Sequence, residues 1–333
     1  MPRKPRQAGE RYYTWRRPRA GEEALFEILV GWRWTAAALL TGCLSVAAVL
    51  AQPAHRRLRA LRGLALAAIV SAVLALLEGF RGAAFPAIKQ VDLPIDRLPE
   101  VFDGLKIAQL SDLHLGTPPT GGAMRRAVAA VQAAKPDLIA LTGDYVSYSR
   151  HLPLVRAALR SLSAPYGIYA IFGNHDHWTH PEAITQVMRE LGIHLLVNEH
   201  RTVRIGNGVL VIAGVDDIWD GHPDLAAALA GAPVGAPVIL LAHAPDYADT
   251  AAQWPVAVQL AGHTHAGHIR LPGLGPLFLP RHGVRYHRGL HRVGQMWLYV
   301  CQGLGGWPIR IGSRAEVTVF TLRRTAEQAP PER

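Results

Sequence analysis

Cysteine is almost absent from this sequence of 333 residues. Its two cysteines, Cys43 and Cys301, lie far apart in the chain. This small number excludes a disulfide framework, and neither cysteine lies in a cluster of the kind that binds a metal through thiolates. Internal repeats and low-complexity tracts are absent as well, which argues against a repeat architecture.

The C-terminal three quarters of the chain lack an excess of charge of either sign. Residues 86–333 contain 22 Lys and Arg against 20 Asp and Glu, whereas residues 1–85 contain 13 against 5. A strongly basic domain could bind nucleic acid, but the near balance after residue 85 leads us to expect no such partner. The positive charge of the N-terminal region flanks apolar runs instead, and attraction to anionic lipid headgroups explains it better.

Two uncharged runs in the N-terminal region predict a membrane anchor. Half of the chain is hydrophobic, and its longest apolar runs are 35–51 and 63–77. The first is just long enough to cross a bilayer, and Trp32 and Trp34 precede it as an interfacial aromatic belt would. The second reaches that length only if Glu78 and Phe80 lie near an interface. We predict a transmembrane helical hairpin; a cleavable signal peptide is the alternative, although its charged leader would be unusually long.

These patterns divide the chain into five segments. We expect a basic tail over residues 1–34, the membrane anchor over 35–85, an extended proline-rich linker over 86–104, a folded domain over 105–323 and a polar tail over 324–333. Arginines lie on both sides of the first apolar run. The positive-inside rule therefore leaves open which side of the membrane the folded domain occupies.

From residue 105 onward, short apolar strands alternate with amphipathic helices. Buried strands are predicted at 105–110, 138–141, 168–172, 209–213, 238–242 and 256–261, with closing strands at 296–300 and 316–322. Helices are predicted at 124–134, 154–162, 181–191 and 225–230. Alternation of this kind indicates a layered α/β architecture.

Polar segments rich in histidine and aspartate follow five of these strands. They are Asp112-Leu113-His114, Gly143-Asp144, Gly173-Asn174-His175-Asp176, His243 and Gly262-His263-Thr264-His265. Open α/β sheets bind ligands beyond the carboxyl ends of their strands, so these side chains should meet at one place. Carboxylate, amide and imidazole donors without a thiolate suit two divalent ions such as Mn²⁺, Fe²⁺ or Zn²⁺. A metal pair of this kind is a recurring device for splitting phosphate esters.

In their order and wording these motifs resemble the calcineurin-like metallophosphoesterase superfamily, over residues 105–322. Its bacterial membrane-associated branch is the most similar, on the segment DGLKIAQLSDLH (103–114) and on the tail segments 302–305 and 308–310. The resemblance implies a four-layer α/β/β/α sandwich, here with the transmembrane hairpin at its N-terminus. His268 departs from that branch, which usually has glutamine there, and it becomes a candidate for substrate contact.

The resemblance also implies a role for each polar residue. It implies seven metal ligands: Asp112, His114 and His265 for a first ion, Asn174, His243 and His263 for a second, and Asp144 bridging both. Water or hydroxide shared by the ions would be the nucleophile. His175 has no place among these ligands, so it is the candidate acid that protonates the leaving oxygen. Asp176 would either orient His175 or form a cap or salt bridge.

We therefore expect a metal-dependent phosphoric ester or diphosphate hydrolase, integral to a bacterial inner membrane. Mn²⁺ is the expected ion, with Fe²⁺ or Zn²⁺ as alternatives. An anchor would hold the site near lipid headgroups, so the expected substrate is lipid-linked. The resemblance suggests UDP-2,3-diacylglucosamine, a lipid A precursor. A broader cell-envelope phosphodiesterase or phosphatase is the alternative, and a non-catalytic scaffold would need ligand losses that this sequence does not show.

Overall fold

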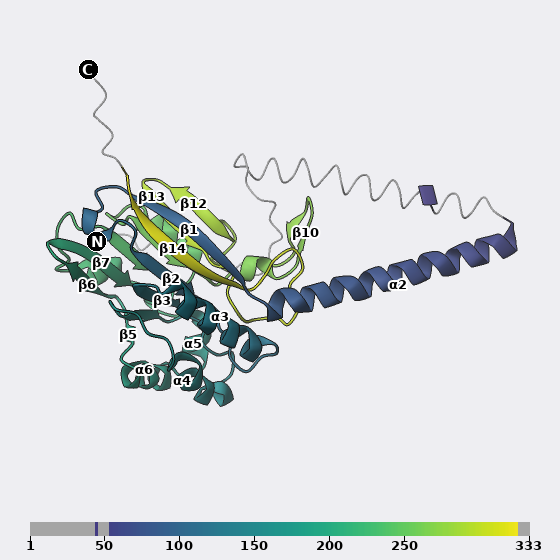
Figure 1. Ribbon diagram of the computed structural model, residues 1–333, viewed down its shortest axis with the longest axis horizontal. Helices are drawn as coiled ribbons and strands as arrows, with labels where there is room; N and C mark the ends of the chain where they lie inside the picture. The colour runs from purple at the N-terminus through teal and green to yellow at the C-terminus, as the bar shows by residue number, and fades with distance from the viewer. Residues whose placement is uncertain (1–43, 46–52, 326–333) are drawn as a thin grey trace, which may run out of the picture.

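Two six-stranded sheets form the centre of the folded domain. The computed structural model describes residues 44–45 and 53–325. The first sheet has the order β1 (Ala87–Ile95), β14 (Glu316–Arg324), β2 (Lys106–Leu110), β3 (Leu138–Thr142), β4 (Ile168–Ile171), β5 (His194–Leu195). The second has the order β12 (Gly289–Val293), β13 (Met296–Val300), β9 (Val258–Ala261), β8 (Val238–Leu241), β7 (Gly208–Gly214), β6 (Glu199–Ile205). A small hairpin, β10 (Arg270–Leu271) and β11 (Gly275–Pro276), lies outside both sheets (Figure 1).

The central strands of both sheets run parallel. Strands β2 to β5 are parallel to one another, and so are β7, β8, β9 and β13, whereas β6 and β12 are antiparallel edge strands. Parallel strands are covered on both faces and therefore appear in a sequence as continuous apolar runs. The predicted strands at 138–141, 238–242 and 296–300 agree with the observed ones to within a residue at each end.

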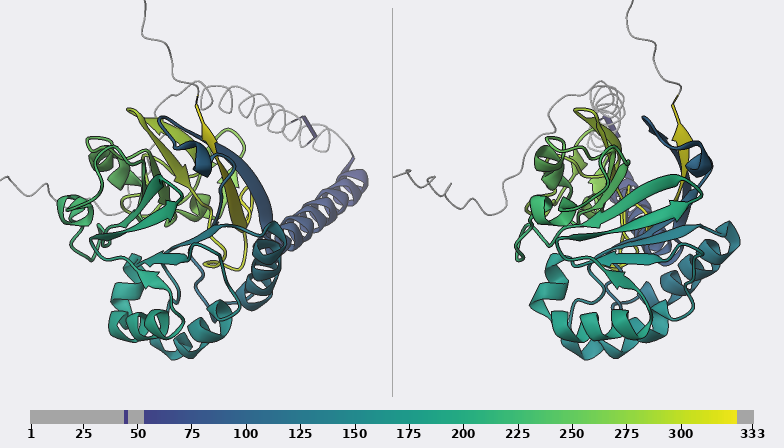
Figure 2. Two further views of the ribbon diagram at one scale, coloured as in Figure 1. Left: turned by 60° about the vertical axis from the view of Figure 1, so that its left-hand side comes forward. Right: turned by 90° about the vertical axis from the view of Figure 1, so that its left-hand side faces the viewer.

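Helices cover the outer face of each sheet. α3 (Thr120–Ala134), α4 (Pro153–Leu159) and α6 (Pro181–Glu190) pack on the first sheet, as the teal helices of Figure 2 show. α7 (Leu225–Leu229) and α8 (Ala248–Ala251) pack on the second sheet. The inner faces of the two sheets share a third apolar core, which includes Ile107, Leu138, Leu210, Ile239 and Leu260. The predicted α/β/β/α order of layers is therefore present.

Residues 86–104 are part of this domain, and the prediction of a linker needs correction. β1 pairs in parallel with β14 along its whole length, and Leu93, Ile95 and Phe102 are buried in the core between the sheets. A short helical turn, η1 (Glu100–Phe102), follows. Pro94 is tolerated because β1 is an edge strand, where a missing N–H costs little. Pro94, the flanking Pro86 and Pro99, and the alternating polar residues made this strand resemble a linker in the sequence.

The predicted second apolar run lies within one long helix, α2 (Ala54–Ala84), which projects from the domain (Figure 1). Residues 56–84 are long and apolar enough to cross a membrane, and their most apolar stretch is not buried by the protein. Apart from Leu44 and Ser45, the first run at 35–51 lies outside the described residues. The hairpin therefore stays a prediction, whereas its second helix has the required length and composition.

The last turns of α2 belong to the folded domain. Gly79 and Gly82 are in contact with residues 309–313, and a Cβ atom at Gly79 would lie 2.6 Å from Ile309 Cγ2. The N–H groups of Arg310 and Ala315 donate to the carbonyl oxygens of Gly79 and Gly82, each at 2.9 Å. The boundary between anchor and domain thus lies near residue 78 and not at residue 85.

Candidate metal centre

The predicted polar segments meet at the carboxyl ends of β2, β3, β4, β8 and β9. Their backbones are tied together, since the N–H of Asp112 donates to Gly143 O at 3.0 Å and that of His114 to Asp144 O at 3.0 Å. The N–H of Gly262 likewise donates to His243 O at 2.9 Å. The N–H of His263 donates to Asp112 Oδ1 at 2.9 Å, so loops from both sheets form one hydrogen-bonded cluster at this edge.

Several residues of this cluster have strained backbones. Asp112, His114, Asp144, His263 and His265 are not glycine, yet all have φ between 40° and 71°. Such conformations cost free energy and persist where the surrounding structure requires them, often at functional sites. The strain thus coincides with five of the seven predicted ligands.

Two glycines of the motifs are required because a larger side chain would collide with a carboxylate, and not because the backbone has a positive φ. A Cβ atom at Gly173 would lie 2.3 Å from Asp144 Oδ1, and one at Gly262 would lie 2.3 Å from Asp112 Oδ2. Only Gly143, among the three glycines that the sequence places at the ends of these strands, has a positive φ, of 86°. Gly173 and Gly262 therefore allow the carboxylates to lie against the backbone.

A first group of ligand atoms consists of Asp112, His114 and His265. The Nε2 atoms of His114 and His265 are 3.2 Å apart, and His265 Nε2 lies 3.4 Å from Asp112 Oδ1. All three side chains are buried, and their ligand atoms lie within 4.8 Å of one another. This is the trio that the family resemblance implied for one ion.

A second group consists of Asp144, His243 and His263, also within 4.8 Å of one another. His243 Nε2 lies 3.3 Å from Asp144 Oδ2 and 3.2 Å from His263 Nδ1. Asp144 Oδ2 is also 3.6 Å from His114 Nε2, in the first group. One carboxylate oxygen therefore faces both groups, as a bridging ligand must.

Asn174 is the remaining ligand that the family resemblance assigned to the second ion, and this assignment stays a prediction. Its side chain is 2% exposed, and its Oδ1 atom is buried without a hydrogen-bond partner. A buried amide oxygen without a partner costs about 1–3 kcal/mol. A cation at this place would satisfy it.

Hydrogen bonds on the far side of three imidazoles favour the tautomers that bind metal. His243 Nδ1 lies 2.7 Å from Thr142 O, and His263 Nε2 lies 2.7 Å from Arg281 O. Because a carbonyl oxygen only accepts, those nitrogens carry protons, which leaves the opposite nitrogen of each ring as the one that can coordinate a metal. His114 Nδ1 lies 2.7 Å from Ser147 Oγ, a hydroxyl that can accept a proton in the same way. Such partners fix the orientation of metal-binding histidines.

The electrostatics of the cluster also fit a cation. Burial raises the pKa of Asp112 to about 6 and lowers the pKa values of His114 and His263 to about 3. Burial opposes charge on His243 too, but the nearby Asp144 carboxylate holds its pKa well above the ordinary value. Most of the imidazoles are thus neutral and free to coordinate, while His243 retains a proton that a cation would displace. The donor set fits two divalent ions.

His175 lies beside the metal ligands without belonging to either trio. One of its ring nitrogens lies within 4.8 Å of His114 and Asp144 ligand atoms. Its ring contacts the rings of His114 and Trp178, with centroids 4.7 and 4.5 Å apart. Its backbone N–H donates to Asp144 Oδ1 at 3.0 Å. The side chain is half-buried, so it can contact both the cluster and a bound substrate.

Asp176 has the capping role that the sequence left open. Its carboxylate accepts N–H groups from Asp144 at 2.7 Å and from Tyr145 and Gly173 at 2.9 Å each. Burial, and then the charge of Asp144, raises the pKa of Asp176 to about 7. Asp176 therefore joins the ligand loops after β3 and β4, at the start of α5 (Asn174–Trp178).

His268 packs against the site from outside. Its ring stacks on that of His265 at 4.3 Å and on that of Trp307 at 5.0 Å. Its Nε2 accepts the Trp307 N–H at 2.9 Å, so its proton is on Nδ1. His268 thus supports a metal ligand directly, and its predicted contact with substrate stays a prediction.

Two tryptophans and one arginine also lie around the predicted metal ligands, and the sequence analysis did not identify them as site residues. Trp219 lies edge-on to His263, with ring centroids 5.7 Å apart, and Trp178 contacts Trp219 at 5.6 Å. Arg310 is 1% exposed and places Nη2 3.2 Å from His265 Nδ1. The position of Arg310 in the family-like tail segment was the one available signal.

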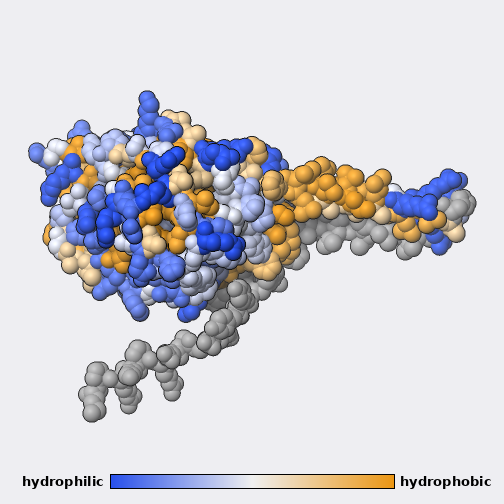
Figure 3. All heavy atoms as spheres, turned by 90° about the horizontal axis from the view of Figure 1, so that it is seen from below, coloured by the Kyte–Doolittle hydropathy of each residue, from blue (hydrophilic) through white to orange (hydrophobic). Residues whose placement is uncertain are grey.

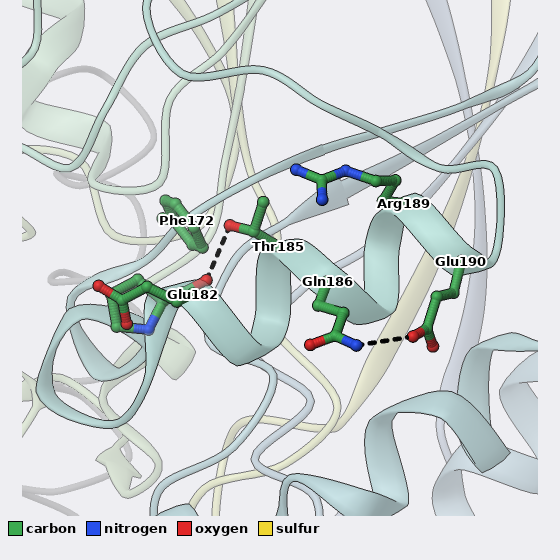
Figure 4. A pocket seen from close by; sticks show the side chains of 7 residues that line it. Phe172, Glu182, Thr185, Gln186, Arg189 and Glu190 are labelled. Atoms are coloured by element: carbon green, nitrogen blue, oxygen red, sulfur yellow. Dashed lines mark hydrogen bonds between the residues drawn. The ribbon is translucent and has the colours of Figure 1, made fainter.

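A separate hollow of about 620 Å³ lies along α6 and contains none of the predicted ligands (Figure 4). Two of its polar side chains bond within the helix, with Thr185 donating to Pro181 O at 2.8 Å and Gln186 to Glu190 at 3.0 Å, and Glu190 pairs with Arg156 of α4. These groups are therefore not arranged around a shared ligand. We regard the metal cluster, and not this hollow, as the functional site.

Comparison with known proteins supports this view. The family model described as calcineurin-like phosphoesterase matches residues 105–267. The uncharacterized metallophosphoesterase YkuE of Bacillus subtilis is 37% identical over 68% of this chain and 82% of its own length. The phosphodiesterase YaeI of Escherichia coli is 32% identical over 65% and 83%. A transmembrane protein with metallophosphoesterase domain of Danio rerio is 34% identical over 78% and 62%. The chain belongs to the calcineurin-like metallophosphoesterases.

Proposed function

We propose that this metal-dependent phosphoester hydrolase is a membrane-anchored phosphodiesterase with two divalent ions. The observation that carries the proposal is the pair of ligand trios that share one oxygen of Asp144. Two ions held in this way would supply Lewis acidity and an activated water for attack on phosphorus. Mn²⁺ is our first candidate, with Fe²⁺ and Zn²⁺ as alternatives, since each suits nitrogen and oxygen donors.

The protein itself would contribute orientation and a proton. His175 lies at the edge of the cluster, where its imidazole can donate to the oxygen that leaves phosphorus. Its backbone bond to Asp144 and its packing on Trp178 hold the ring in place. Asp176 acts through these loops by fixing their backbones, and not on the substrate.

We infer that the substrate is a phosphoester or diphosphate attached to lipid. The supporting observation is α2, which is long and apolar enough to cross a membrane and is joined to the catalytic domain through Gly79 and Gly82. The relative named as a transmembrane protein agrees with this anchoring. UDP-2,3-diacylglucosamine, in the inner membrane of a bacterium, stays a prediction from family resemblance. The names of the relatives support only the class of bond, so a broader cell-envelope phosphodiesterase is the second candidate.

The proposal is tested by removing and restoring the metal. Purified full-length protein in detergent should lose hydrolysis of bis(p-nitrophenyl) phosphate after chelation and regain it with Mn²⁺. Elemental analysis should show two ions per chain in the wild type and fewer in Asp144→Ala. His175→Ala should retain both ions and lose turnover. Full activity in the metal-stripped protein would refute the two-metal assignment.

A further inference from the structure

Four exposed apolar side chains lie on the β10–β11 hairpin and on the loops next to it. Leu271 and Leu274 lie at the turn between β10 and β11, Phe278 follows that hairpin, and Trp307 lies in the loop after β13. Their exposed fractions are 39%, 43%, 55% and 48%. The rings of Phe278 and Trp307 are 5.8 Å apart. We name these four residues the apolar rim.

Stacked rings connect this rim to the metal ligands. Trp307 stacks on His268 at an interplanar angle of 22°, and His268 stacks on His265 at 24°. Backbone contacts agree, because a Cβ atom at Gly267 would meet Phe278 O at 2.6 Å. Trp307 and Phe278 thus border the active site, and the rest of the apolar rim continues from them onto the hairpin.

The same rim is joined to the base of α2 through one short segment. Ile311 pairs with Ile269, its N–H donates to His268 O at 3.0 Å and its carbonyl accepts from Arg270 at 2.7 Å. The neighbouring Arg310 N–H donates to Gly79 O of α2. Figure 1 shows β10 at the end of the domain from which α2 projects, and Figure 3 shows apolar surface continuing from α2 onto the domain.

Charged side chains lie at the same level as the base of α2. A hollow of about 380 Å³ there is lined by residues of α2, including Glu78, and by Arg288 and Arg314. Arg314 also donates to Phe85 O at 2.8 Å, just beyond the helix. Arginines next to the end of a membrane helix lie at the depth of lipid phosphates. Aromatic residues are enriched at the same interface.

We propose that the apolar rim docks into the surface of the lipid bilayer that α2 crosses. If α2 crosses the bilayer, its base lies at the membrane surface. Because hydrogen bonds join the apolar rim to that base, the rim lies at the membrane surface as well. An exposed apolar patch beside an active site marks an interaction surface. The metal centre then lies at headgroup level, and a lipid phosphoester reaches it without leaving the bilayer. This inference rests on the anchoring in the proposed function, but not on the chemistry.

Fluorescence quenching in nanodiscs tests the docking. Full-length protein with Cys43→Ser would carry one new cysteine, Phe278→Cys or Leu274→Cys, labelled with an environment-sensitive fluorophore. Cys301 is fully buried and should not react. Val234→Cys is the matched control, because Val234 is fully exposed and precedes β8, at the end of the sheet opposite the metal centre. The nanodiscs would contain phosphatidylcholine and phosphatidylglycerol, with or without doxyl-labelled lipid.

Doxyl lipid should lower the fluorescence at positions 274 and 278 by about twofold or more relative to position 234, since interfacial groups lie within roughly 5–10 Å of the acyl boundary. Iodide in the buffer should quench position 234 instead. Strong iodide quenching at 278 and 274 would overturn the proposal, because the rim would then face water. Protection from both quenchers would overturn it too, since a second copy of the chain or another protein would cover the rim. Each readout is independent of hydrolysis, so a failure of the proposed chemistry remains distinguishable.

Discussion

The junction between α2 and the domain can be tested by moving a truncation boundary through it. One soluble variant would begin at residue 86 and a second at residue 78. The second retains Gly79, Gly82, Ala83 and Ala84, which contact the domain, and it lacks most of the apolar length of α2. We expect the shorter variant to be clearly less stable.

The size of the effect follows from the contacts that are lost. The N–H groups of Arg310 and Ala315 lose their acceptors on α2, at about 1 kcal/mol for each hydrogen bond. Ala83 and Ala84 are 2% and 7% exposed, and uncovering two methyl groups costs about 1.5 kcal/mol. The free energy of unfolding should fall by about 3.5 kcal/mol, which is a large part of a typical total of roughly 5–15 kcal/mol.

Thermal unfolding followed by circular dichroism would measure the difference. For a domain of this size, a loss of about 3.5 kcal/mol corresponds to a decrease of roughly 7–14 °C in Tm. Hydrolysis of a soluble phosphodiester should also fall, because Arg310 contacts both α2 and the ligand His265. Equal Tm and activity in the two variants would refute the assignment of residues 78–85 to the domain.

A substitution pair in the full-length protein provides a matched control. A Cβ atom at Gly82 would meet the backbone oxygen of Arg310 at 3.0 Å, whereas one at Gly63 meets nothing within 4 Å. Gly82→Leu should therefore separate α2 from the domain and lower activity, and Gly63→Leu should leave it unchanged. Similar loss in both variants would point to a general effect of leucine in this helix.

Three further outcomes are expected. Gly262→Ala should abolish metal binding in elemental analysis, because its Cβ would displace the Asp112 carboxylate; normal metal content would count against the close approach. Asp176→Asn should lower the free energy of unfolding by about 2–4 kcal/mol, measured in urea, since the amide faces several N–H donors with one oxygen. The stability lost in His177→Gln should be largest at weakly acidic pH. The hydrogen bond to Asp216 raises the pKa of His177, so this loss of stability should become smaller as the pH rises through that pKa. The loss should also become smaller as the pH falls through the lowered pKa of Asp216. A loss independent of pH would show that the pair does not contribute through its charges.

The site was predictable because its ligands follow buried strands. Five of the predicted strands end shortly before a ligand, and parallel strands bring such ends to one edge. The grouping of Asp112, His114 and His265 around one place came from family resemblance, and the distances agree with it. The capping role of Asp176 could not be chosen in advance, because it depends on backbone N–H groups that meet only in the folded chain.

Other features of the structure could not be predicted, because no local sequence pattern indicates them. β1, β6 and β12 are edge strands with exposed polar residues, so they show no continuous apolar run. Trp219 contacts the predicted ligand His263, and Trp307 contacts His268, both from loops, and no periodicity marks a loop contact. The end of α2 packs against residues 309–313, which lie more than two hundred residues later in the sequence, so no local pattern predicts this contact. In the sequence, the two glycines involved resemble ordinary glycines of an apolar helix.

The strand order of the first sheet has a consequence for biosynthesis. β14 lies between β1 and β2, although the ribosome makes it after every other strand. The first sheet therefore stays divided, with β1 separate from the rest, until the end of the domain has emerged. By then α2 is already available for insertion into the membrane. The nascent enzyme would be tethered before it can fold, and premature termination before residue 316 would leave an anchored chain with an open sheet edge exposed to proteases.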